Sequence, residues 1–189
     1  MNKLLKLPLF LGIAGAACGG VLAGVNALTA PVIAENAEKV ANQAYYDTFA
    51  EFGAELDIDK TLTINDALKG AGVKTKASVK AEGLEGIVYS CTVTGAATAG
   101  GNDLSFQVAF ANGNYYGYTT ISQKESAGYG EKTFNYLADY LPGLDASTTI
   151  EKPSAVSGAS QTWNAVADAI KVCAEDYVAN HKQTTQGGH

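Results

Sequence analysis

The feature that most constrains the fold is a long uncharged stretch near the N-terminus, residues 7–34. It consists mainly of apolar residues and glycine, with Asn26 as its main polar interruption. Roughly 20 apolar residues are enough to cross a bilayer as a helix. Lysines precede the stretch and glutamates follow it, a bias that favours an N-terminus in the cytoplasm. The sequence therefore predicts a single-pass anchor in the cell (inner) membrane, with the rest of the chain on the extracytoplasmic side.

Two other interpretations of this segment remain open. A cleaved signal peptide has a shorter apolar region that ends in small residues. The residues from Ala14 to Ala17 are similar to such a cleavage site, but the apolar stretch continues past them. A lipoprotein would carry its lipid on Cys18, although Gly15 stands where such signals usually have leucine. We expect the uncleaved anchor, in contact with membrane lipid.

The composition excludes several classes of function. Hydrophobic residues make up 47% of the 189 residues, enough for one domain with a sizeable core plus an extension. The net charge of −6 argues against a nucleic-acid partner, because no basic face is available to neutralise phosphates. Both histidines, His181 and His189, lie in the polar C-terminal tail, and the three cysteines are scattered. We therefore expect no metal site and no catalytic acid, base or nucleophile.

Hydrophobic periodicity predicts an α+β domain with a small antiparallel sheet flanked by helices. Apolar residues alternate, as in strands, over residues 86–94 and 104–111. Residues 115–123 are expected to form the strand that returns from the second of these, and 148–150 is expected to add an edge strand. The apolar faces are expected to carry Ile87, Tyr89, Cys91 and Val93 in the first strand, and Leu104, Phe106, Val108 and Phe110 in the second. The residues from Asn112 to Asn114 are typical of a hairpin turn. Helical spacing marks residues 35–56, 64–68, 134–141 and 160–180.

These patterns divide the chain into an anchor (1–34), a helical connector (35–76), a domain (77–181) and a polar tail (182–189) that we expect to be disordered. Cys91 is expected on a strand and Cys173 on the last helix, both on apolar faces. Two buried free thiols are the plainer expectation. In an exported domain the two could instead pair and close a long loop.

The start of the last helix carries the most specific motif. Ser157, Gly158 and Ala159 form a small turn that leads into two hydroxyl residues, Ser160 and Thr162. A helix start has unpaired backbone N–H groups and a partial positive charge, which together favour a bound phosphate. Serine and threonine at this place are also common helix caps. The motif alone therefore leaves open whether the hydroxyls cap the helix or hold a phosphorylated ligand.

The order Ser/Thr-Gly-Ala-Ser/Thr-x-Thr resembles the flavinylation motif of the FMN-binding domain family. This family includes the G subunit of Rnf electron-transport complexes and the C subunit of sodium-pumping NADH:quinone reductases. In it, the last threonine of the motif is esterified to the phosphate of FMN. The resemblance implies that Thr162 carries a covalent FMN, while Ser157, Gly158, Ala159 and Ser160 shape the phosphate seat.

Two further stretches resemble the same family. Residues 125–130 are similar to its Glu-Thr-Pro-Gly-Leu-Gly signature, with Glu125, Gly128 and Gly130 matching. This implies that these residues border the flavin and that Tyr129 either stacks on its ring or packs in the core. Residues 25–36 resemble the membrane exit of the Rnf family members, where the anchor leads through a turn with threonine and proline into an amphipathic helix.

The resemblance implies an electron carrier that belongs to a membrane-bound, ion-translocating oxidoreductase of the Rnf type. Its partners would be the other membrane subunits of that complex, and a flavin transferase would attach the FMN. Two alternatives remain: a stand-alone membrane-anchored FMN-binding protein in extracellular electron transfer, and an anchored binding module with no enzymatic role, in which the turn at Ser157 is only a helix cap.

Overall fold

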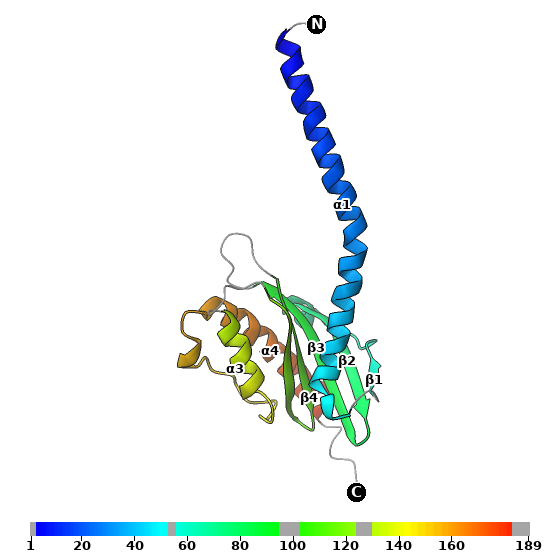
Figure 1. Ribbon diagram of the computed structural model, residues 1–189. Helices are drawn as coiled ribbons and strands as arrows, with labels where there is room; N and C mark the ends of the chain where they lie inside the picture. Colours follow the sequence, from blue (N-terminus) through cyan, green and yellow to red (C-terminus); the bar gives the residue numbers. More distant parts are fainter. Residues whose placement is uncertain (1–2, 53–55, 95–102, 124–129, 183–189) are drawn as a thin grey trace. The chain divides into compact units, whose positions relative to one another are not determined.

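The structure is a computed structural model that describes residues 3–52, 56–94, 103–123 and 130–182 (Figure 1). The chain forms two compact units, Met1–Asn42 and Gln43–His189. In chain order the elements are α1 (Lys3–Thr48), η1 (Ala50–Phe52), β1 (Asp57–Asp59), α2 (Asp66–Gly70), β2 (Val73–Ala81), β3 (Leu84–Thr94), β4 (Asp103–Ala111), β5 (Asn114–Ser122), α3 (Gly130–Tyr140), η2 (Ser154–Val156) and α4 (Ser160–Asn180), where η marks a short 3-10 helix. The expected α+β fold with an N-terminal apolar helix is confirmed. The tail that we expected to be disordered lies, from residue 183 on, outside the described residues.

The first unit contains most of helix α1, whose length and composition would allow it to cross a membrane. Its large apolar side chains are exposed along the helix, for example Phe10 and Leu28. The turn expected near Thr29 and Pro31 is wrong, because the helix continues through both residues. The Thr29 hydroxyl donates a hydrogen bond to the carbonyl oxygen of Val25 at 2.9 Å, one turn earlier.

The second unit is organised around a five-stranded antiparallel sheet in the order β1-β2-β3-β4-β5. The three strands expected from the sequence are β3, β4 and β5, whereas β1 and β2 are additions. The hairpin between β4 and β5 is confirmed: Asn112 and Gly113 both have positive φ, 53° and 81°. That combination is typical of the two-residue turn whose twist matches the strands it joins. β2 runs across residues 76 and 77, where we expected a boundary between connector and domain.

One face of the sheet packs against α3 and α4 (Figure 1). The expected apolar faces of β3 and β4 are confirmed, because the eight residues predicted for them all lie in or against this core. From α4 the core receives Trp163, Val166, Ala169, Ile170, Cys173, Ala174 and Tyr177. Tyr177 stacks on Phe110 with ring centroids 4.9 Å apart. Its hydroxyl also accepts the backbone N–H of Gly113 at 3.0 Å, which ties the end of α4 to the hairpin.

The other face of the sheet is covered by the end of α1, which belongs to the second unit. Tyr45 and Phe49 are buried there, and Phe49 stacks on Tyr116 at 4.7 Å. The Thr48 hydroxyl lies 2.8 Å from that of Thr119. The helix predicted to reach residue 56 therefore ends at Thr48, because the chain turns there to insert Phe49 into this second core.

A buried ion pair lies in the core between the sheet and helices α3 and α4, which we call the first core. The ammonium of Lys76 lies 2.6 Å from the carboxylate of Asp176, and the two side chains are only 7% and 6% exposed. The hydroxyl of Tyr89 donates to the same carboxylate at 2.7 Å. Burial raises the pKa of Asp176, but the hydrogen bonds from Lys76 and Tyr89 and the charge of Lys76 lower it by more, so that the pKa lies below its ordinary value. The pair links β2 and α4, which are far apart in the sequence.

The edge strand expected at residues 148–150 is wrong, since this segment is not part of the sheet. The chain instead approaches β5 a few residues earlier. The N–H of Tyr115 donates to the carbonyl of Leu144 at 2.8 Å, and that of Ala146 donates to Gly113 at 2.9 Å. The expected helices at 64–68, 134–141 and 160–180 correspond to α2, α3 and α4.

Candidate functional site

Helix α4 starts without a side-chain cap. Ala159 is the N-cap residue, and it has no side-chain group that could accept a hydrogen bond. The first intrahelical bond runs from the N–H of Trp163 to the carbonyl of Ala159 at 2.8 Å. The interpretation of the motif as a plain serine or threonine cap therefore finds no support in the geometry. A phosphate or another anion would supply the acceptor that a capping side chain otherwise provides.

The turn before α4 depends on Gly158. Its φ is +92°, a conformation that side chains with a Cβ rarely adopt. On one side of it, the N–H of Ser157 donates to the carbonyl of Ser154 at 3.1 Å and closes the short helix η2. On the other side, Ala159 is buried. The small residues of the motif thus set a fixed entry into α4.

The two hydroxyl residues of the motif differ in exposure. Ser160 is exposed and its hydroxyl accepts a hydrogen bond from the ammonium of Lys152. Thr162 is only 1% exposed. Its neighbour Trp163 is buried against α3, with its ring 5.9 Å from that of Tyr136. The start of α4 therefore has an exposed lysine and serine and a buried threonine.

Helices α3 and α4 begin at the same end of the domain. Both helices finish near the β4–β5 hairpin: Gly143, just after α3, bonds to Tyr115, and Tyr177 in α4 bonds to Gly113. Their N-termini therefore lie at the opposite end, where β3 and β5 finish (Figure 1). Gly130 is buried at the start of α3. Glu125, Gly128 and Tyr129 lie outside the described residues, so of the second signature only Gly130 can be placed.

The first turn of α3 contains a residue that the sequence analysis missed. The hydroxyl of Thr133 is fully buried and has no hydrogen-bond partner in the described part of the chain. A buried hydroxyl without a partner costs free energy, so it calls for an explanation. The burial pattern of an amphipathic helix predicts that Thr133 faces inward beside Phe134 and Leu137, but nothing in the sequence predicts that it lacks a partner.

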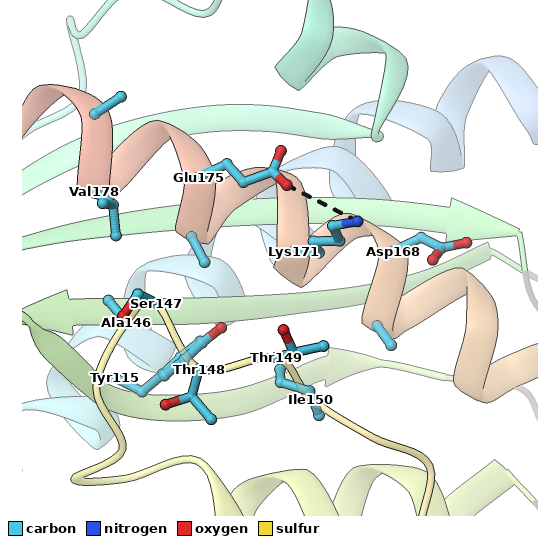
Figure 2. Close-up of a pocket in the computed structure, with 13 residues that line it drawn as sticks. Tyr115, Ala146, Ser147, Thr148, Thr149, Ile150, Asp168, Lys171, Glu175 and Val178 are labelled. Carbon is cyan, nitrogen blue, oxygen red and sulfur yellow. Dashed lines mark ion pairs between the residues drawn. The ribbon is translucent and has the colours of Figure 1, made fainter.

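A well-formed groove lies elsewhere, between residues 146–150 and α4 (Figure 2). Its volume is about 380 Å³, and α4 lines it from Ala167 to Ala179. Lys171 and Glu175 stand at its rim, 4.0 Å apart. It contains none of the residues expected to hold a flavin. A second hollow, of about 540 Å³, lies between α2, the end of β3 and α4, and reaches Ala165, which is three residues after Thr162.

The residues at the start of α4 are suited to binding an anion. Two helix N-termini and Lys152 provide positive potential for an anion. The described residues contain no group of histidine, cysteine, aspartate or glutamate that could hold a metal ion. The residues placed at the mouth of α4 are hydroxyls, small residues and a lysine, which suit a phosphate.

The comparisons with known proteins bear on the same segment. A search of curated proteins and a search of solved structures each gave no significant match. The family model described as FMN-binding domain matches residues 100–175. The matched range contains Gly130, Thr133 and the whole motif from Ser157 to Thr162. Residues 100–175 of this chain thus match the FMN-binding domain family, which supports a flavin-binding domain built on β4, β5, α3 and α4.

Proposed function

We propose that this chain is the FMN-carrying subunit of a membrane-bound, ion-translocating electron-transport complex of the Rnf type, with FMN esterified to Thr162. The observation that carries the proposal is the FMN-binding domain match over residues 100–175, which includes the motif at the start of α4. The apolar helix α1 supports attachment to a membrane. Complex membership rests on the resemblance of residues 25–36, 125–130 and 157–162 to the Rnf members of the family.

The described residues fit a phosphorylated flavin. The uncapped start of α4 offers backbone N–H donors to the phosphate, and Lys152 adds a charge beside Ser160. The buried hydroxyl of Thr133 is a polar group that lacks a partner in the described part of the chain, at the same end of the domain. Bound FMN would supply one- and two-electron transfer. The chain would hold it near the membrane.

The burial of Thr162 constrains how the flavin is attached. A side chain that is 1% exposed cannot reach the active site of a transferase in the packed domain. We expect the transferase to act while the first turn of α4 is open, before Trp163 packs against Tyr136. Attachment would then belong to maturation of the chain and not to its turnover.

Ion transport would reside in the partner subunits. The apolar stretch at residues 7–34 contains no charged residue. Ionisable groups inside the membrane mark most ion pathways. We therefore assign this chain the electron-carrying step and assign the coupling ion to other membrane subunits of the complex.

The test is covalent flavin fluorescence. The full chain is expressed with a flavin transferase, separated on a denaturing gel and viewed under ultraviolet light. We expect a fluorescent band for the wild type and none for Thr162→Val, which preserves the buried volume but removes the hydroxyl. Gln161→Ala is the matched control, because Gln161 is exposed and occupies the variable position of the motif. Fluorescence of Trp163 reports whether each variant is folded.

The outcomes separate the candidate functions. A colourless wild-type band contradicts covalent FMN and leaves the anchored binding module. A band that stays fluorescent in Thr162→Val shows that the flavin is attached elsewhere. Where the band behaves as expected, genes for partner subunits beside this gene favour the complex, whereas an isolated gene favours the stand-alone FMN-binding protein.

A further inference from the structure

The first core contains two thiols in contact. The sulfur atoms of Cys91 in β3 and Cys173 in α4 lie 3.7 Å apart, and the residues are 82 positions apart in the sequence. They are 1% and 0% exposed. Both are free thiols in this structure, as the plainer expectation from the sequence had it. The third cysteine, Cys18, lies exposed on α1 in the first unit.

We propose that Cys91 and Cys173 form a disulfide in the oxidised domain, which joins the central strand of the sheet to the helix that begins at the candidate flavin site. A disulfide requires sulfur atoms about 2.05 Å apart, so the two sulfurs must approach by roughly 1.7 Å. β3 is bonded to strands on both sides, and α4 packs directly on it. The backbone therefore already holds the two side chains in facing positions.

The reaction is thiol–disulfide exchange. One cysteine, as a thiolate, attacks a low-molecular-weight disulfide or a disulfide-bearing oxidoreductase and releases one thiol. The second cysteine then attacks the mixed disulfide and releases the second thiol. The new bond forms with the loss of one proton from each cysteine, and two electrons pass to the oxidant, which ends as two thiols. An extracytoplasmic position gives access to such oxidants.

The burial of the two thiols determines the stage of folding at which the disulfide can form. The buried environment raises the pKa of the Cys173 thiol well above its ordinary value, and the contact with Cys91 raises it further. The thiolate is the nucleophile, so exchange in the packed core is slow. The bond would therefore form while the chain folds and, once formed, would be shielded from reductants in solution.

The link would enclose almost the whole flavin-binding segment. The loop from Cys91 to Cys173 contains β4, β5, α3 and the first two-thirds of α4. It covers nearly all of residues 100–175, the range that matches the FMN-binding domain family. A crosslink at the two ends of this range restricts the unfolded chain and so stabilises the folded segment. The inference rests on the contact of the two sulfurs and on an extracytoplasmic position, and it stands whether or not FMN is bound at Thr162.

The test uses the full chain in detergent micelles. The protein is unfolded and reduced, then refolded either with dithiothreitol or with a mixture of reduced and oxidised glutathione. The refolded protein is then denatured in the presence of an excess of iodoacetamide, which alkylates free thiols, and the alkylated cysteines are counted by mass spectrometry. We expect three alkylated cysteines after reducing refolding and one, Cys18, after refolding with glutathione.

Two controls identify the pair. A tryptic digest of the oxidised protein should contain residues 81–124 linked to residues 172–182, the peptides that carry Cys91 and Cys173. Cys18→Ala should yield two alkylated cysteines after reducing refolding and none after refolding with glutathione. Three alkylated or glutathione-bound cysteines in the wild type under both conditions would overturn the proposal, as would a crosslinked peptide that contains Cys18.

A second readout measures the stability of the oxidised and reduced forms. Urea unfolding, followed by Trp163 fluorescence, should show a higher midpoint for the oxidised wild type than for the reduced wild type. Cys91→Ala/Cys173→Ala should show one midpoint that does not respond to reductant. Equal midpoints for the oxidised and reduced wild type would contradict a link across this core.

Discussion

The buried pair of Lys76 and Asp176 gives the most demanding test of the packing. The carboxylate of Asp176 accepts hydrogen bonds from Lys76 at 2.6 Å and Tyr89 at 2.7 Å, and from the amides of Asn180 and Asn65 at 3.0 and 3.3 Å. Asp176→Asn keeps the size of the side chain but leaves the buried ammonium of Lys76 without a counter-charge. Breaking a buried pair in this way costs about 3–5 kcal/mol of unfolding free energy.

The exposed pair of Lys171 and Glu175 is the matched control on the same helix. Its charged groups are 4.0 Å apart, and the side chains are 69% and 66% exposed. Water screens such pairs, so Glu175→Gln should cost about 0–0.5 kcal/mol. Within the buried pair, Lys76→Met should cost much less in the Asp176→Asn background than in the wild type, because the charge that needs a partner is then absent.

The assay is urea unfolding of the full chain in detergent micelles. Trp163 is the single tryptophan of the chain and is buried where α3 meets α4, so its fluorescence reports the unfolding of the first core. A cost for Asp176→Asn below about 1 kcal/mol, or equal to that of Glu175→Gln, would refute the reasoning that Lys76 and Asp176 are a desolvated pair.

Asp176, Gly72 and Thr133 each give a further prediction. The pKa of Asp176 is lowered on folding, so the stability it contributes is present above its unfolded pKa of about 3.9 and is lost as the pH falls through the folded value. Urea unfolding measured at pH values from about 6 to about 2 should show acid destabilisation that is weaker in Asp176→Asn than in the wild type. Identical pH profiles of the unfolding free energy would contradict this. Gly72→Ala should destabilise the domain by more than about 1 kcal/mol, because the φ of Gly72 is +84° and a Cβ would come within 2.3 Å of the carbonyl oxygen of Thr92. Gly70→Ala is the control: a Cβ there has open space, so the variant should be neutral or stabilising. Equal urea midpoints for the two variants would count against this conformation of Gly72. Thr133→Val removes a buried hydroxyl that lacks a partner in the described part of the chain, so it should stabilise flavin-free protein by about 1 kcal/mol. A loss of stability in the flavin-free state would show that the hydroxyl is satisfied.

Local sequence patterns predicted much of the fold. Alternation predicted β3 and β4 and their buried faces, and the residues Asn112 and Gly113 predicted the hairpin that returns as β5. β2 was missed although Val73, Ala77 and Val79 alternate with polar residues, a pattern typical of a half-buried strand. The lysines among them masked that signal, since Lys76 is buried only because Asp176, a hundred residues away, neutralises it. No local rule predicts such a partner.

The errors have a common physical origin in tertiary contacts. Residues 148–150 have β-branched side chains, but the backbone of Tyr115 in β5 is bonded by Gly143 and Leu144 instead, and the segment lines a groove with α4. The helix that was expected to reach residue 56 stops at Thr48, where Phe49 enters the second core. β1 is a three-residue edge strand with no pattern of its own.

The candidate site was predictable in part. The motif located the start of α4, because small residues and hydroxyls before an apolar helical stretch are a local signal. That Ala159 would be the N-cap, that Thr162 would be buried, and that α3 would start at the same end of the domain all depend on packing. Thr133 is the clearest omission, since its lack of a partner among the described residues emerges only once the domain is assembled.

The most direct test of the central claim is the mass of one peptide. Trypsin should release residues 133–171, which contain Thr162, from protein isolated from its own membranes, because the bond between Lys152 and Pro153 resists cleavage. We predict that this peptide carries the mass of FMN less one water, and that fragmentation places the addition on Thr162. A peptide of unmodified mass, from a host that possesses a flavin transferase, would contradict the claim that this chain carries electrons on a covalently bound FMN.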